Sequence, residues 1–211
     1  MLRFWSMLCS VAIHMRKSPF YLTVLLLALG LTFLQGCEAP KRDIFILDST
    51  KVLEPASELR DVITWSVVAV GPVADSLNKE SLEIIQGLLQ EGLIQKQFSA
   101  IALDRVRGLS EQYGSTEAGA LRAVAALKAD AVLILSLGEW DESGLYTLGK
   151  VRAKGEIKLV DSKQKIRWGG NLKVDSVLIP STAKNASLEE KRLLAVQNFA
   201  RQLARRLPSQ F

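Results

Sequence analysis

Hydrophobic residues first gather in an uncharged run, Phe20–Phe33, which follows Arg16 and Lys17. The segment Leu34-Gln35-Gly36-Cys37 follows the run directly, with the small residue Gly36 before Cys37. A short basic segment, an apolar segment and a small residue before a cleavage point are the parts of an export signal. A membrane-spanning helix needs roughly 20 apolar residues. This shorter run therefore favours a cleaved signal peptide, residues 1–36, over a retained membrane anchor.

After residue 60 the pattern alternates between strand-like and helix-like segments. Val62–Val70 is apolar, rich in β-branched residues and followed by Gly71-Pro72, which predicts a buried strand. Apolar residues at spacings of three and four predict a helix across Leu82–Leu93. Phe98–Leu103 is a shorter strand candidate. Ala131–Leu137 is apolar enough for a central strand that is covered on both faces.

Two further helices are predicted from capping signals. Gly114-Ser115-Thr116-Glu117 supplies an N-cap hydroxyl and an acid in the first turn. Ser187 and Glu190 stand at the spacing of a capping box, and an apolar stripe from Leu193 to Leu207 follows them. The last of these helices is expected to end at Pro208.

The segment between these helices has a period of two. Apolar residues alternate with charged ones from Val151 to Leu159, and the alternation returns from Ile166 to Val174 after a polar link. Two such runs joined by a short polar segment predict an antiparallel hairpin with one face in the core. Trp168 is expected on the inner face.

The predicted order is β-α-β-α-β-β-β-α, which gives an α/β (α+β) fold: a mixed sheet with helices packed on it. This domain is expected to span 61–211. Residues 37–60 are polar, contain Pro40 and Pro55, and are expected to form a tether. Within the tether, Ile44–Leu47 is either a short strand clipped onto the domain or a docking segment for the membrane or a partner.

Composition excludes several classes of enzyme. The chain has 27 basic and 22 acidic residues and a formal charge of +5, and its signal holds three of the cations and no acid. The remaining 24 cations against 22 acids give a charge of +2, which offers no argument for nucleic acid. His14 is the only histidine, and it lies in the signal with Cys9. Histidine-dependent triads, His-ligated zinc and intrachain disulfides are therefore excluded after processing, and no cofactor is expected.

Two groups of acidic residues are candidate sites. Glu139, Asp141 and Glu142 follow the central strand, and such carboxylates can bind a hard cation or carry out acid–base chemistry. An ordinary acidic turn is the simpler interpretation. Asp130 precedes the same strand and is either a functional acid or a residue that accepts hydrogen bonds from nearby backbone amides. No catalytic residue and no metal ligand is assigned.

The outer face of the predicted hairpin is the third candidate. Its acids are Glu156 and Asp175. Its cations are Lys150, Arg152, Lys154, Lys158, Lys165, Arg167 and Lys173. This face is either a solvated surface whose lysines protect a sheet edge or a contact surface for an anionic partner. Such a partner could be an acidic protein, lipopolysaccharide phosphates or a neighbouring protomer.

Leu34-Gln35-Gly36-Cys37 resembles the lipobox of bacterial lipoproteins. The resemblance implies that the chain is cleaved between Gly36 and Cys37 and that the Cys37 thiol is acylated. Because Met15-Arg16-Lys17-Ser18 makes a compact basic segment, translation is expected to begin at Met15. Glu38 stands where an inner-membrane retention signal has Asp, so the expected location is the outer membrane, facing the periplasm.

The domain also resembles envelope lipoproteins whose soluble domains are similar to the N-terminal domain of TolB and to the core of the curli secretion lipoprotein CsgG. The matching segments are Trp65–Pro72, Ala129–Val132 and Ile166–Gly170, within about 62–207. The resemblance implies a non-enzymatic part in envelope assembly or export, often as an oligomer. The long membrane-inserting hairpins of the curli channel have no counterpart, so a pore is not expected.

These observations predict a lipid-anchored periplasmic accessory or assembly subunit that is not an enzyme and acts through envelope protein partners. A homo-oligomer is compatible with this prediction. Two other classes stay open. One is a carboxylate-dependent hydrolase of envelope polymers, and the other is a structural lipoprotein that links the membrane to the cell wall.

Overall fold

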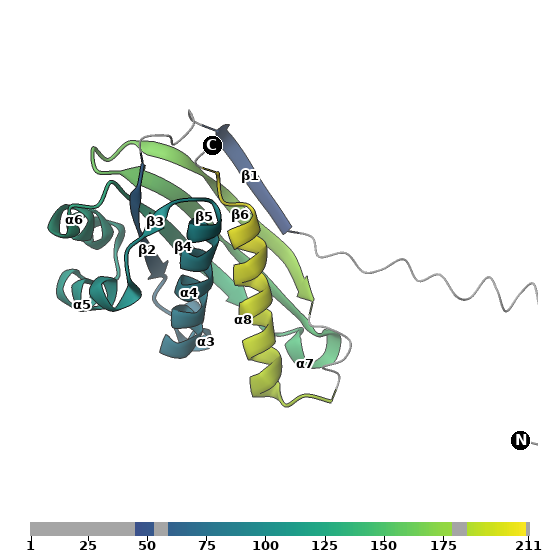
Figure 1. The fold of residues 1–211 in the computed structure, drawn as a ribbon. Helices are drawn as coiled ribbons and strands as arrows, with labels where there is room; N and C mark the ends of the chain where they lie inside the picture. The colour runs from purple at the N-terminus through teal and green to yellow at the C-terminus, as the bar shows by residue number, and fades with distance from the viewer. Residues whose placement is uncertain (1–44, 53–58, 179–184, 210–211) are drawn as a thin grey trace, which may run out of the picture. The chain divides into compact units, whose positions relative to one another are not determined.

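The computed structural model describes residues 45–52, 59–178 and 185–209, and Asp43–Phe211 forms one compact unit (Figure 1). The strands are β1 (Phe45–Val52), β2 (Asp61–Val68), β3 (Ser99–Ala100), β4 (Ala131–Asp141), β5 (Lys150–Asp161) and β6 (Ile166–Leu178). The helices are α3 (Pro72–Ser76), α4 (Lys79–Gln95), α5 (Leu103–Tyr113), α6 (Glu117–Leu127), α7 (Leu145–Leu148) and α8 (Leu188–Arg205). The predicted fold class is confirmed.

The described strands form one mixed sheet in the order β1-β6-β5-β4-β2-β3. β2 runs parallel to both β3 and β4, whereas the pairs β4–β5, β5–β6 and β6–β1 are antiparallel. Parallel neighbours need a crossover connection, usually a helix, and antiparallel neighbours need only a turn. The strand–helix alternation up to Asp141 and the hairpin after it therefore account for the two halves of the sheet.

Helices cover the two faces of the sheet unequally. α4 and α8 lie side by side across one face (Figure 1), and the larger core there includes Ile85, Phe199 and Leu133. On the opposite face α5 and α6 pack mainly on β2 and β4, over a smaller core that includes Trp65 and Ile134. Among the described helices, none extends over β6 on this second face.

The helix starts agree with the capping signals in the sequence. Asn78 caps α4 by accepting a hydrogen bond from the Ser81 amide (2.8 Å), and Thr116 caps α6. At α8 the predicted capping box is confirmed. The Glu190 amide donates to Ser187 Oγ (3.2 Å), and the Ser187 amide donates to Glu190 Oε2 (2.7 Å). These bonds satisfy amides that have no partner within the helix.

The close approach of α4 and α8 depends on Gly92. A Cβ placed on Gly92 would lie 2.7 Å from Ala204 Cβ and 3.2 Å from Ala204 Cα, so the helices could not keep their separation. The small residues at this contact let the two backbones approach, and the larger core lies between these helices and the sheet.

The hairpin β5–β6 is confirmed, with one departure from the predicted alternation. Trp168 lies opposite Leu159 and is only 6% exposed, as its inward position requires. Ile166 was expected on the same inner face, but it is 43% exposed. The register shifts between Leu159 and Val160, where an extra residue on β6 opposes the pair. Such a bulge ends the strict period of two.

A strand lies within the segment predicted as a tether. β1 pairs antiparallel with β6, with Phe45 opposite Val174 and Val52 opposite Trp168. The strand interpretation of Ile44–Leu47 is confirmed for residues 45–47, and Ile44 lies outside the described residues. Because β1 covers one edge of β6, the sheet includes residues that precede the predicted boundary at residue 61.

The helix α5 was not predicted from the sequence. One helix was predicted between Phe98–Leu103 and Ala131–Leu137, but both α5 and α6 occupy this stretch, and β3 is only two residues long. The apolar stripe of α5 is thin, with Val106 its only buried residue. In the part of the chain that the structure describes, every helix is too short or too polar to cross a membrane.

Replacing Trp168 with Ala should lower the free energy of unfolding by about 3–5 kcal/mol, because a large buried side chain leaves a cavity. The matched control is Asn171→Ala, an exposed position on the same strand, which should change stability by no more than about 0.5 kcal/mol. Urea denaturation of both variants measures the difference. If the two variants were equally stable, Trp168 would not be part of the core.

Candidate functional site: the open face of the sheet

The part of the second sheet face that lies over β5, β6 and the end of β4 is the candidate contact surface, and is called the open face. Its side chains are polar and at least partly exposed: Ser136, Glu139, Asp141, Arg152, Lys154, Glu156, Asn171, Lys173 and Asp175. No described helix packs against them. The site residues Gly36 and Cys37 lie outside the described residues.

Ion pairs between neighbouring strands order the open face. Arg152 Nη2 lies 2.6 Å from Asp141 Oδ2, and Lys154 Nζ lies 2.6 Å from Glu139 Oε2. Both pairs are residues directly opposite each other in the antiparallel ladder of β4 and β5. Opposite charges at such positions stabilise a sheet modestly. The pairs therefore fix the side chains of the face more than they stabilise the fold.

This arrangement corrects the expectation of a strongly cationic face. The sequence predicts only Glu156 and Asp175 as the acids of this face, and it favours a turn at Glu139 and Asp141. Instead β4 continues to Asp141 after an irregularity between Leu137 and Glu139. The longer strand brings both carboxylates alongside the cations of β5.

Lys158 does not belong to an accessible surface. It is 9% exposed, and its Nζ lies 2.8 Å from Glu117 Oε2 at the start of α6 and 3.6 Å from Glu156 Oε2. Burial alone would lower the pKa of Lys158, but the hydrogen bond with Glu117 and the two carboxylate charges raise it above its usual value. Lys158 was expected on the outer face, but it serves to fasten α6 to β5.

The remaining predicted cations fall in different places. Lys173 shares the open face and lies 3.7 Å from Asp175. Lys150 lies at the border of this face, in a cleft beside α7 that Asp141, Arg152 and Asp175 also line. Arg167 lies at the far end of the hairpin, with its Nε 3.8 Å from Asp161 Oδ2. At that end the Lys165 amide donates to Asp161 Oδ1 (2.8 Å). The seven residues therefore do not form one continuous patch.

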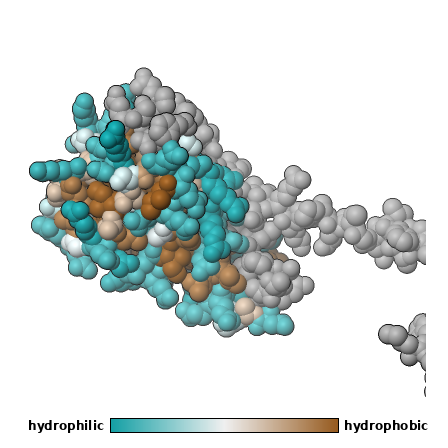
Figure 2. Space-filling view, viewed as in Figure 1, coloured by the Kyte–Doolittle hydropathy of each residue, from teal (hydrophilic) through white to brown (hydrophobic). Residues whose placement is uncertain are grey.

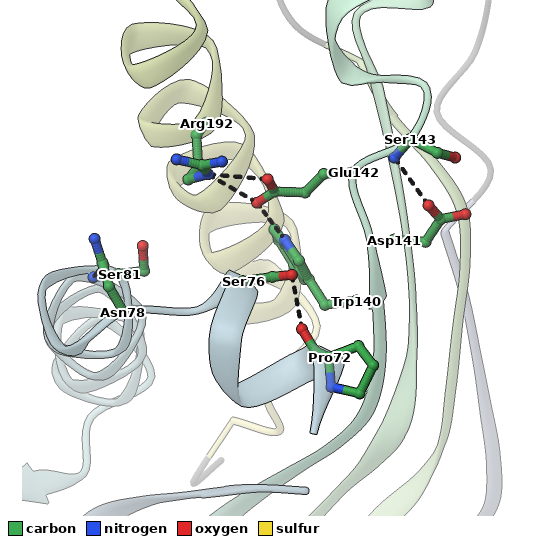
Figure 3. Close-up of polar contacts among 9 residues, drawn as sticks. All are labelled: Pro72, Ser76, Asn78, Ser81, Trp140, Asp141, Glu142, Ser143 and Arg192. Carbon is green, nitrogen blue, oxygen red and sulfur yellow. Dashed lines mark hydrogen bonds and ion pairs between the residues drawn. The ribbon is translucent and has the colours of Figure 1, made fainter. Parts of the chain in front are cut away.

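Glu142 has a structural partner that the sequence did not reveal (Figure 3). Arg192 Nε on α8 donates to both oxygens of Glu142, at 3.1 and 2.9 Å, and Trp140 Nε1 donates to Glu142 Oε1 at 2.9 Å. The Trp140 ring also meets Phe199 edge to face, with centroids 5.3 Å apart. Fifty residues separate Glu142 from Arg192, so no local pattern could have indicated this contact.

Asp130 accepts backbone hydrogen bonds, as the simpler interpretation predicted. Its Oδ2 accepts from the amides of Arg60 and Asp61, both at 3.0 Å, and its own amide donates to Asp61 O at 2.9 Å. The residue thereby joins the starts of β2 and β4. Within residues 45–52, 59–178 and 185–209, no group of three or more Asp, Glu, His or Cys side chains could hold a metal ion.

No protein-family model and no curated protein matches the chain. Among solved structures, the fold is similar to a PelC dodecamer from Paraburkholderia phytofirmans (12% identity, 75% of this chain and 96% of that chain, TM-score 0.43). It is also similar to lipoprotein GNA1162 from Neisseria meningitidis (16% identity, 69% and 99%, TM-score 0.41). A third is the LpoB C-terminal domain from Salmonella enterica (14% identity, 62% and 87%, TM-score 0.37).

Asp141 should make the stability of the protein depend on pH. Hydrogen bonds from the Ser143 hydroxyl and amide, together with Arg152, lower the pKa of Asp141 from 3.8 to about 2. The ionised carboxylate is therefore favoured in the folded state, so its contribution is present above about pH 4 and is lost as pH falls through about 2. Asp141→Asn should destabilise the protein at neutral pH, and the difference from wild type should shrink below pH 4.

Urea unfolding at a series of pH values measures this difference, and NMR titration of the carboxyl carbon gives the pKa directly. Ser143→Ala serves as the companion variant, because it removes the hydroxyl donor and should raise the pKa of Asp141. An Asp141 carboxyl that titrates at its ordinary value of 3.8 in the wild type would contradict the pairing described here.

Proposed function

We propose that this chain is a lipid-anchored accessory subunit of an envelope assembly or export complex, held at the periplasmic side of the outer membrane. The observation that carries the proposal is the lipobox, Leu34–Cys37, directly before a compact unit that begins at Asp43. Acylation of Cys37 would attach that unit to the membrane through a short segment. The subunit then acts through contacts with other proteins, either envelope partners or further copies of itself.

The state of the carboxylates favours contact over catalysis. Glu139, Asp141 and Glu142 are each bound to a cation, from Lys154, Arg152 and Arg192 respectively. A carboxylate-dependent hydrolase needs acids that can exchange protons with a substrate. Glu83 and Glu111 line one cleft together, but Glu83 is paired with Arg107 at 3.2 Å. We therefore place the accessory role first.

The open face supports a role in binding proteins. Both signs of charge alternate across it in fixed pairs, and such a pattern selects a partner with the complementary arrangement more than it adds affinity. This favours a specific protein partner over a general anionic surface such as lipopolysaccharide. A purely structural linker between membrane and wall would have no need of an ordered charged face.

The anchor would orient the domain with α7 toward the membrane. β1 begins at Phe45, opposite Val174, at the end of the sheet where β5 begins and α7 lies (Figure 1). Eight residues from Cys37 to Phe45 can span at most about 28 Å. Tyr146 and Leu148 of α7 are 73% and 66% exposed, and Lys191 Nζ lies 5.2 Å from the Tyr146 ring centroid. Tyrosine, leucine and lysine together suit a membrane interface.

Cys37→Ser should abolish acylation, signal cleavage and stable association with the membrane. Two or more acyl chains hold a protein firmly, at about 0.8 kcal/mol per buried CH₂ group, and this variant would have none. Metabolic labelling with a fatty-acid analogue and sucrose-gradient fractionation measure both effects. Label in the Cys37→Ser protein would show that Cys37 is not the acylated residue. Co-migration of the wild type with the inner membrane would contradict the proposed location.

A cysteine at position 148 would report the orientation, because acylation of Cys37 leaves no other thiol in the processed chain. Leu148→Cys, labelled with an environment-sensitive fluorophore in lipidated form, should be quenched by spin-labelled lipids in proteoliposomes. Lys163→Cys, in the turn at the opposite end of β5, is the matched control and should not be quenched. Equal quenching at the two positions would rule out a fixed orientation with α7 at the membrane.

A further inference from the structure

β2 is paired along both edges only at its beginning. β3 contributes two residues, and its pairing with β2 ends at Val62 opposite Ala100. On the other edge the pairing of β2 with β4 continues to Val68 opposite Leu137. In Figure 1, α4 and α5 lie on either side of β3. Beyond Val62, the edge of β2 therefore faces the space between these two helices.

The hydrogen bonds at both ends of β2 show which residues face this edge. On the β3 side, Arg60 O and Val62 O accept from the amides of Ser99 (2.8 Å) and Ile101 (2.9 Å). Residues of odd number bond to β4 instead, as Asp61 O and the Ala69 amide do. Because neighbouring residues of a strand alternate between its edges, Thr64, Ser66 and Val68 direct both N–H and C=O toward this edge. Thr64 is only 1% exposed, so the accessible part of the edge runs from Ser66 to Val68, both of which are partly exposed.

A cleft of about 330 Å³ lies along this edge, between α4 and α5. Trp65 and Ser66 of β2 line it, with Gln86 from α4 and Ser110 and Arg107 from α5. Figure 2, viewed as Figure 1, shows hydrophobic patches among hydrophilic residues on this side of the molecule. The described residues that line the cleft are mostly polar or charged, and Leu82 is the one aliphatic residue among them. The cleft therefore combines polar and charged side chains with the accessible part of the strand edge.

Two residues that line the cleft carry buried donors for which the described part of the chain offers no partner. Trp65 is 2% exposed, and its Nε1 has no hydrogen-bond partner within the described residues. The same is true of Arg107 Nε, which also belongs to a residue of the cleft, and of Oγ1 of the neighbouring Thr64. Indole and guanidinium N–H groups only donate, so they require acceptor atoms. Buried donors without acceptors are rare in folded proteins and call for an explanation.

The chemistry of the edge identifies the ligand class. A small anion could satisfy the Trp65 and Arg107 donors, but it could not donate to the carbonyl groups of Ser66 and Val68. A peptide main chain offers both donors and acceptors at the spacing of a strand, which is how a peptide adds to a sheet edge. The accessible edge, Ser66 to Val68, is long enough for about three residues of added strand.

We propose that an extended segment of a partner protein binds in the cleft between α4 and α5 and adds to the open edge of β2, in line with β3. This inference deepens the proposed accessory role by naming how a partner is held. It is tested separately, because peptide binding by the detergent-solubilised mature protein does not depend on where the lipid anchor places the domain.

The test selects binders from a phage-displayed library of heptapeptides on the full mature chain and measures the affinity of the best synthetic peptide by calorimetry. Gln86→Trp fills the cleft from α4 and should weaken binding at least tenfold. Ser110→Trp fills it from α5 and should do the same, which guards against a local defect in one helix. Lys163→Trp, in the exposed turn of the hairpin, is the matched control and should bind like the wild type.

Two N-methylated forms of the selected peptide test the strand geometry. In one form the methyl groups are on the alternate amides that would face β2, and this peptide should not bind. In the other form they are on the remaining amides, which would face away from β2, and this peptide should bind nearly as well as the parent. The proposal fails if selection on the wild-type protein enriches no peptide relative to selection on the Gln86→Trp protein. It also fails if both methylated peptides bind as well as the parent peptide. It also fails if the protein dimerises through this cleft, shown by a concentration-dependent dimer that Gln86→Trp abolishes, because a second copy would then occupy the edge.

Discussion

Unequal coverage of the sheet is the constraint on which the rest of the structure depends. α4 and α8 cover one face completely enough to bury the larger core, and Gly92 lets them approach each other. On the other face α5 and α6 lie mainly over β2 and β4. The half that these helices leave uncovered must be polar, and the two-residue β3 leaves most of one edge of β2 unpaired. Both candidate contact regions follow from this arrangement.

The ion pairs on the exposed open face and those beside the helices contribute differently to the structure. On the open face, Arg152–Asp141 and Lys154–Glu139 lie in water and give the surface an ordered pattern of charge at little gain in stability. At the boundary with the covered half, Lys158 is buried and its pair with Glu117 ties α6 to β5. Glu142 and Arg192 likewise join the loop after β4 to α8. The position of a cation relative to the helices therefore decides whether it is available to a partner.

The sequence predicted those features of the structure that depend on residues close together in the chain. The alternation of β5 and β6, the capping box at Ser187 and the backbone bonding of Asp130 were all readable from the sequence. The charge of the open face could not be predicted, because the acids Glu139 and Asp141 that pair with its cations lie on β4. The length of β4 depends on its pairing with β5. α5 was missed because Val106 is its only buried residue. The roles of Cys37 and the resemblance to TolB and CsgG stay predictions.

The central claim is that β2 presents an open edge between α4 and α5, and amide hydrogen exchange of the free mature protein tests it most directly. The amides of Trp65 and Val67 belong to the ladder with β4 and should exchange slowly. The amide of Ser66, which is partly exposed and faces the open edge, should exchange far faster, although it lies in the same strand. Equally slow exchange at all three amides in the free monomer would show that the edge is already covered, and would contradict the account.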